Sequence, residues 1–174
     1  PQDGAAQAGG GEVKRALLAA LLLCGCGAEV SLGGSVGEVI DLTVSRCEVY
    51  RNAFGLQVTY YRNRDTFLDV VARMSVALDG VDLKAGTKVD LAGESSPGHQ
   101  RASFAHAPGG EPVRLFPNVK RGDLYVSQLG AEGQVTKGSF SVLFASEGGD
   151  LGTGRTLYGN FAARTVDAGY GPEF

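Results

Sequence analysis

Apolar and polar residues alternate along most of the chain after residue 36, which is the pattern of strands with one buried face. Val, Ile, Thr, Tyr and Phe are common in the alternating segments, and Gly, Pro, Asn or Asp separates them. The pattern predicts strands at 39–44, 47–51, 56–61, 67–78, 81–83, 88–91, 101–106, 124–129, 135–144 and 155–164. We therefore expect an all-β fold: a single β-sandwich-like domain over 37–174, as a sandwich or a barrel-like sheet.

The segment 67–78 fits two periodicities. Phe67, Val70, Val71, Met74 and Leu78 follow helical spacing. Every even position from 68 to 78 is also apolar, which fits strict alternation better. Asp79-Gly80 then supplies a turn signal. We interpret the segment as a long strand and keep a helix as the alternative.

Two hairpins are expected. In the first, 47–51 returns as 56–61 through the turn signal Asn52-Ala53-Phe54-Gly55. In the second, 135–144 and 155–164 each contain Gly-x-Phe, ending at Phe140 and Phe161. Glycine beside an aromatic residue in a strand indicates a bend, or a ring lying over bare backbone. We expect the rings of Phe140 and Phe161 to meet on one face, so that this hairpin anchors the core.

A different pattern precedes the alternating part. Lys14 and Arg15 stand before an apolar run over 16–23, which ends in Leu23-Cys24-Gly25-Cys26. A spanning helix needs about 20 apolar residues, and this run is far shorter. A short apolar run behind two cations is typical of a cleaved export signal.

The end of this run, Leu23-Cys24-Gly25-Cys26, resembles the lipobox of bacterial lipoproteins. The resemblance covers 13–26 only. It implies cleavage before Cys26, which would carry a thioether-linked diacylglycerol and usually an N-acyl chain such as palmitate. Two or more acyl chains suffice to anchor a protein stably in a membrane. It also implies a place in the cell envelope. In such lipoproteins an aspartate directly after the acylated cysteine favours retention in the inner membrane. This chain has Gly27 at that position, which favours the outer membrane.

These expectations divide the chain as a signal peptide over 13–25, a lipidated N-terminus and tether over 26–36, and the β domain. The prefix 1–12 is rich in Gly, Ala and Gln and has no hydrophobic periodicity. This predicts either a disordered segment or a misassigned translation start, in which case translation begins at position 13, now read as Val13. Two alternatives stay open for the apolar run. It is an ordinary secretory signal with incidental cysteines, or a buried core helix.

Charge and cysteine content narrow the classes of partner. The net charge is −3 and no basic stripe occurs, which argues against nucleic acid. Three cysteines make no disulfide framework. With Cys24 cleaved away and Cys26 acylated, Cys47 would be alone, and its place on the same strand face as Val49 predicts a buried apolar thiol.

Candidate chemistry is sparse. Tyr60, Tyr61, Arg62 and Arg64 gather at one strand end, and aromatic rings with guanidinium groups can stack on sugars or on a protein partner. His99 and His106 lack an evident third ligand, which predicts two surface histidines and no metal site. No Gly-x-Ser-x-Gly elbow occurs. We expect no catalytic residue, metal or cofactor.

The function expected from these features is that of an extracytoplasmic lipoprotein, held to the membrane through Cys26, with a binding or structural role. Its partner would be an envelope protein or a glycan. Two alternatives remain. One is an extracytoplasmic hydrolase using carboxylates such as Asp65 and Asp69. The other is a carbohydrate-binding module, although the chain has no tryptophan for a platform.

Overall fold

The computed structural model describes residues 29–64, 67–109 and 111–167. The predicted signal and Cys26 therefore lie outside the described residues. Strands make up most of the described chain, with one 3-10 helix, and no helix in this part is long and apolar enough to cross a membrane. The elements are β1 (Ser31–Gly33), η1 (Ser35–Glu38), β2 (Arg46–Arg51), β3 (Gly55–Asn63), β4 (Leu68–Ala77), β5 (Lys88–Asp90), β6 (Glu94–Ser96), β7 (His99–Gln100), β8 (Ala102–Ala107), β9 (Arg114–Leu115), β10 (Val119–Gln128), β11 (Val135–Phe144) and β12 (Thr156–Asp167).

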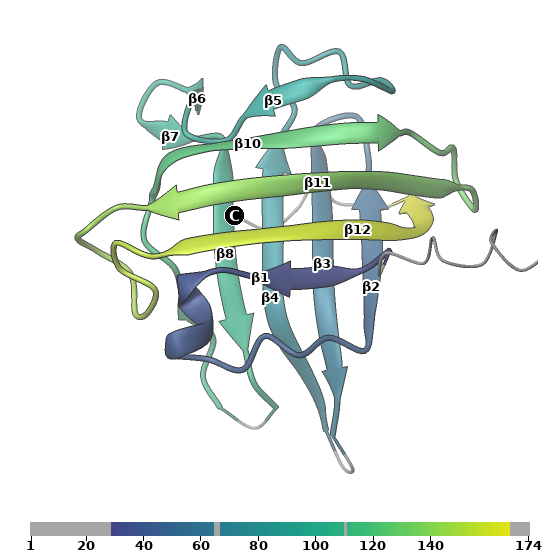
Figure 1. The fold of residues 1–174 in the computed structure, drawn as a ribbon. Coiled ribbons are helices and arrows are strands. Elements are labelled where there is room, and N and C mark those ends of the chain that lie inside the picture. Colours follow the sequence, from purple (N-terminus) through teal and green to yellow (C-terminus); the bar gives the residue numbers. More distant parts are fainter. Residues whose placement is uncertain (1–28, 65–66, 110, 168–174) are drawn as a thin grey trace, which may run out of the picture.

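One curled sheet forms the domain. Its strand order is β5-β10-β11-β12-β2-β3-β4-β8-β9, with β1 also paired to β12. Figure 1 shows β10, β11 and β12 running crosswise to β2, β3, β4 and β8, so that the sheet folds over into two layers. The all-β prediction is confirmed, and the two layers belong to a single sheet that curls into a half-barrel.

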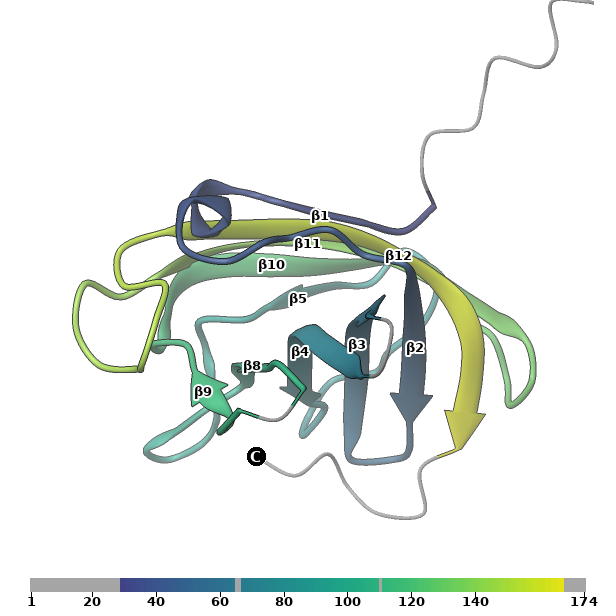
Figure 2. The same ribbon diagram turned by 90° about the horizontal axis from the view of Figure 1, so that it is seen from below.

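Strand β12 joins the two layers. Along 156–164 it pairs with β11, and at 165–167 it pairs with β2 in parallel, whereas the other strand pairs of the sheet are antiparallel. Its bend toward β2 is plain in Figure 2. A twisted sheet can cover its own inner face in this way without a second sheet.

The core fills the space between the layers with one face of each strand. A group of rings lies at its centre: Phe104 packs edge-on against Phe144 at 5.4 Å and lies 5.6 Å from Phe140, while Phe116 stacks on Phe144 at 4.8 Å. Tyr60 adds a further ring 6.2 Å from Phe140. Strands of both layers contribute to this cluster, which therefore holds the curled sheet together.

The predicted hairpin of β11 and β12 is confirmed, and its glycines explain the aromatic placement. Gly138 lies opposite Phe161, and Gly159 lies opposite Phe140. A Cβ at Gly138 would come within 2.5 Å of Phe161 Cζ, and one at Gly159 within 3.0 Å of Phe140 Cε1. Each ring thus covers the bare backbone of the other strand.

The remaining predictions divide. The β2–β3 hairpin is confirmed, as is a strand rather than a helix over most of 67–78. The segments 39–44 and 81–83 are not strands. Conversely, the small β6–β7 hairpin lies in 94–100, where no strand was predicted. The alternation in 39–44 arises because alternate side chains are buried, although the segment forms no β-ladder. Ile40 is buried, and Leu42 is half-buried and packs against the core.

The predicted tether, 26–36, is partly inside the fold. Within it, Ser31–Gly33 pair with β12 as β1, and Val36 of η1 is fully buried. The described domain therefore starts much closer to Cys26 than the sequence suggested.

Candidate functional site

The predicted contact surface of Tyr60, Tyr61, Arg62 and Arg64 is divided by strand alternation. Tyr60 is fully buried and its hydroxyl donates to the carbonyl of Asn160 at 3.1 Å. Its ring therefore joins the two layers and is not part of the surface. Tyr61 points to the opposite face of β3 and remains half-buried.

The two arginines of that group surround Asp69, whose side chain is 2% exposed. Arg62 Nη2 lies 2.9 Å and Arg64 Nε 2.7 Å from Asp69 Oδ2, and the backbone N–H of Gly109 donates to Oδ1 at 2.7 Å. Arg62 Nη1 also reaches Asp41 at 2.5 Å. The N–H of Gly109 and the Arg62 guanidinium hold the pKa of Asp69 below its ordinary value.

This network ties β3 and β4 to the segments at 41 and 109. Asp69 was a carboxylate candidate for hydrolysis, but both of its oxygens accept structural bonds and it stays ionised. Asp65, the other candidate, lies outside the described residues. The network therefore holds the lower end of the half-barrel together, and only Arg64, with 60% of its side chain exposed, remains available to a partner.

A polar and aromatic patch lies on the outer face of β2 and β3. The Arg46 guanidinium stands 4.8 Å from the centre of the Tyr61 ring, and its Nη1 bonds Glu48 at 2.7 Å. The Tyr50 hydroxyl donates to the other oxygen of Glu48 at 2.6 Å. This bond to the Glu48 carboxylate raises the pKa of Tyr50 to about 12. Sequence reasoning missed Arg46, Glu48 and Tyr50, although their i, i+2, i+4 spacing marks a single strand face.

The histidines do not share an environment. His99 is exposed, with Nδ1 3.2 Å from the carbonyl of Pro97. His106 is 3% exposed, and its Nδ1–H donates to the carbonyl of Val71 at 2.9 Å. The prediction of two surface histidines is therefore wrong for His106. It faces inward beside a break in the β4–β8 register, where the Val71 carbonyl needs a donor.

Cys47 was predicted to be buried and is only half-buried, packed against the core from β2, with its Sγ 3.8 Å from the carbonyl of Ala162. Burial raises the pKa of its thiol, which disfavours the reactive thiolate. No group of three or more metal-binding side chains occurs in the part of the chain that the structure describes.

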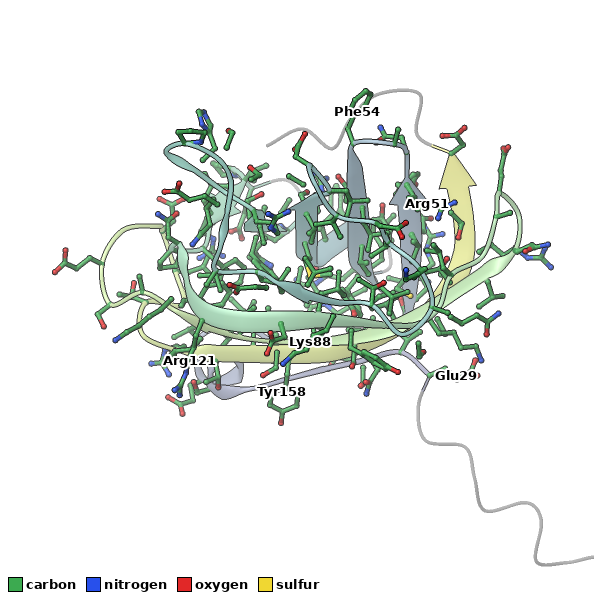
Figure 3. The ribbon with its side chains drawn as sticks, turned by 90° about the horizontal axis from the view of Figure 1, so that it is seen from above. Glu29, Arg51, Phe54, Lys88, Arg121 and Tyr158 are labelled. Carbon is green, nitrogen blue, oxygen red and sulfur yellow. The ribbon has the colours of Figure 1, made fainter. Side chains whose placement is uncertain are left out.

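A cleft opens at the end of the molecule where β2 turns into β3 and β12 ends. We call it the end cleft. It has a volume of about 390 Å³ and is lined by Arg51, Asn52, Ala53, Leu78, Val81, Leu83, Glu132, Thr165 and Asp167. Arg51 and the exposed ring of Phe54 lie at this end in Figure 3.

The end cleft combines an apolar wall with charges of both signs. Leu78, Val81 and Leu83 form the wall. Arg51 lies opposite Asp167 in the β2–β12 register, but no ion pair within 29–64, 67–109 and 111–167 involves either residue. Such a surface can take an amphipathic ligand that carries a charged group.

A second hollow, of about 450 Å³, lies between the β6–β7 hairpin and the segment 116–118. It is lined mainly by small and polar residues, including Ser95, Ser103 and Asn118, and His99 is also in its lining. Its polar side chains stand mostly on β6, β7 and β8, and Asp79 is the one carboxylate among the described residues of its lining, so the end cleft offers the better combination of apolar contact and charge.

Comparison with known proteins gives no relative. No family model, curated protein or solved structure matches this chain.

Proposed function

We propose that this chain is an extracytoplasmic bacterial lipoprotein, anchored in the cell envelope through an acylated Cys26, and that it acts by binding. The observation that carries the proposal is the order of the N-terminal features: two cations, an apolar run and Leu-x-Gly-Cys.

Lipidation is tested by expressing the full chain in a bacterium and following incorporation of labelled palmitate. We expect the label in the wild type and its loss in Cys26→Ala. Cys24→Ala is the matched control, since it removes the neighbouring thiol and leaves the cleavage site in place. Loss of label in Cys24→Ala but not in Cys26→Ala would move the modified residue, and no label in any form would end the proposal.

The binding role is assigned to the end cleft because its apolar wall and Arg51 lie together at the surface. The probe is anilinonaphthalene sulfonate, which carries an apolar ring system and one negative charge. We expect its fluorescence to rise with the folded wild type and to rise less with Arg51→Gln. Arg121→Gln, an exposed arginine on another face, is the control and should behave as wild type. An equal rise with Arg51→Gln would remove the cleft from consideration.

A further inference from the structure

The outer face of β10, β11 and β12 carries two exposed tyrosines that the end cleft does not use. Tyr125 is 46% and Tyr158 54% exposed. In the strand register Tyr125 lies opposite Ser139, and Tyr158 lies opposite Ser141. Both tyrosines therefore face outward on either side of β11, which presents two serines between them. We call this surface the tyrosine face.

Tyr158 has the geometry of a stacking platform. Its ring lies over Gly33 of β1, where an added Cβ would come within 2.7 Å of Tyr158 Cε2 and 2.8 Å of Cζ. One side of the ring thus rests on bare backbone, while about half of the residue's surface remains exposed to solvent. Figure 3 shows the side chain on the outer side of the ribbon, on the same face as Lys88 and Arg121. The ring needs no rearrangement to accept a flat ligand, which reduces the entropic cost of binding.

Hydrogen-bonding groups surround the open ring. Ser139, Ser141 and Asn160 lie on the same face. Asn160 Nδ2 donates to Ser31 Oγ at 3.2 Å, and this bond fixes the orientation of the Asn160 side-chain amide. A hollow of about 250 Å³ includes Ser141, the register partner of Tyr158, and is lined by Arg121, Gly122, Asp123, Ser141, Val142, Leu143 and Thr156. Hydroxyl and amide groups both donate and accept, which suits a ligand rich in hydroxyl groups.

The face carries charges of both signs in nearly equal number: three carboxylates stand against Lys88, Arg121, Lys137 and Arg164, the last exposed on the outer side of β12. Lys88 pairs with Asp123 at 3.0 Å, and Lys137 pairs with Glu29 at 2.8 Å. Arg121 and Asp90 add one charge of each sign. A membrane surface would be attracted by a basic patch or by a broad apolar area, and the face has neither. The complementary ligand is therefore uncharged, polar at its edges and apolar on its flat side.

We infer that the tyrosine face binds a neutral oligosaccharide. A pyranose ring offers an apolar C–H side to Tyr158 and its hydroxyl edge to Ser141 and Asn160. Strand spacing places the Cα atoms of Tyr125 and Tyr158 about 12 Å apart, which spans several sugar rings. Tyr125 then contacts a second ring of the same chain. This inference does not depend on lipidation or on the end cleft.

The test measures retention of the full chain, carrying Cys26→Ala so that anchoring plays no part, on four insoluble neutral polysaccharides: cellulose, chitin, mannan and β-1,3-glucan. Vesicles of phosphatidylethanolamine and phosphatidylglycerol are assayed in parallel. We expect retention on at least one polysaccharide, with affinity about tenfold lower in Tyr158→Ala and close to wild type in Tyr158→Phe. Phe54→Ala, at an exposed ring on the other layer, is the matched control and should bind as wild type.

Far-UV circular dichroism and the melting midpoint establish that each variant is folded. The inference is overturned by no retention on any of the four polysaccharides. It is also overturned by retention that Tyr158→Ala leaves unchanged, or by vesicle binding that Tyr158→Ala abolishes, which would make the surface a membrane contact.

Discussion

At the scale of single residues, the contact between Phe161 and Gly138 shows how a strand position without a side chain stabilises the fold. Phe161 is 1% exposed and its ring occupies the space that a Cβ at Gly138 would need. We predict that Phe161→Ala lowers the free energy of unfolding by about 3–5 kcal/mol, because it opens a cavity between the layers. Urea denaturation followed by circular dichroism measures the change.

Phe54→Ala is the matched control, since Phe54 is the same residue type with 68% of its surface exposed. It should change stability by less than about 0.5 kcal/mol. Gly138→Ala should also destabilise, since the new methyl group would meet both the Phe161 ring and the backbone carbonyl of Tyr125. Equal stability of the Phe161 and Phe54 variants would contradict this account of the core.

The buried His106 leads to a second prediction. His106→Ala should cost about 1–3 kcal/mol, because the carbonyl of Val71 loses its donor inside the protein. His99→Ala, at the exposed histidine, should leave the melting midpoint unchanged. Differential scanning calorimetry of both variants checks the contrast, and similar midpoints for the two would place His106 outside the core.

Tyr50 gives a prediction in pH. Its hydroxyl donates to Glu48, and this bond raises its pKa to about 12. The raised pKa means that the contribution to stability is complete below the ordinary tyrosine pKa of about 10 and is lost as the pH rises through about 12. Subtracting the phenolate absorbance of Tyr50→Phe from that of the wild type isolates the ionisation of Tyr50, which should therefore occur near pH 12. Glu48→Gln should move that step down, and a step near pH 10 in the wild type would refute the bond.

At the scale of elements, Asp69 connects the ends of β3 and β4 to the neighbouring segments. We predict that Asp69→Asn lowers the free energy of unfolding by about 1–3 kcal/mol, because the neutral amide cannot accept from Arg62, Arg64 and the Gly109 N–H as the carboxylate does, while Arg62 keeps its pair with Asp41. Asp82→Asn, on a carboxylate with 85% of its side chain exposed, is the control and should have little effect. Guanidinium titration of both variants measures the difference.

The same carboxylate predicts acid sensitivity. Because the folded pKa of Asp69 is lowered from 3.8, its contribution is complete above that pH and is lost as the pH falls through the lowered value. Wild type should therefore lose stability below about pH 4 faster than Asp69→Asn. Parallel curves for the two proteins over this range would show that Asp69 is not bonded in this way.

The elements that could be predicted from the sequence are those in which alternation and turn signals agree. The hairpins β2–β3 and β11–β12 have both, and the structure confirms them. Alternation alone was insufficient at 39–44, where Ile40 and Leu42 cover the core from a segment without ladder bonds. The parallel pairing of β12 with β2 joins residues more than a hundred positions apart, and no local pattern reports it.

The candidate sites were less predictable for a related reason. Alternation indicates that Tyr60 and Tyr61 face opposite sides, but it does not indicate which side is buried. Arg62 and Arg64 suggest solvent by composition, and only the fold brings Asp69 and Gly109 to them. The tyrosine face could not be predicted from the sequence, because only the strand register places Tyr125, Ser139 and Tyr158 on one surface.

At the scale of the whole molecule, the position of Glu29 restricts where the domain can lie relative to the proposed anchor. Glu29 is bound to β11 through its 2.8 Å ion pair with Lys137. Cys26 precedes it by three residues, and a fully extended chain of that length spans about 10 Å. If Cys26 is acylated, the domain lies directly against the lipid headgroups, with no room for a protease in between.

We therefore predict that the lipidated wild type, reconstituted in vesicles, is not released by proteinase K, whereas a variant with ten Gly/Ser residues inserted between Gly27 and Ala28 is released. The insertion adds flexible chain without altering the cysteine or the fold, so a difference reports accessibility of the tether alone. Sedimentation of the vesicles, followed by detection of the domain in the supernatant, measures release. Palmitate labelling of both proteins verifies that anchoring is equal. Release of the wild type at the same rate as the insertion variant would show that the domain stands away from the membrane and that Glu29 is not held against β11.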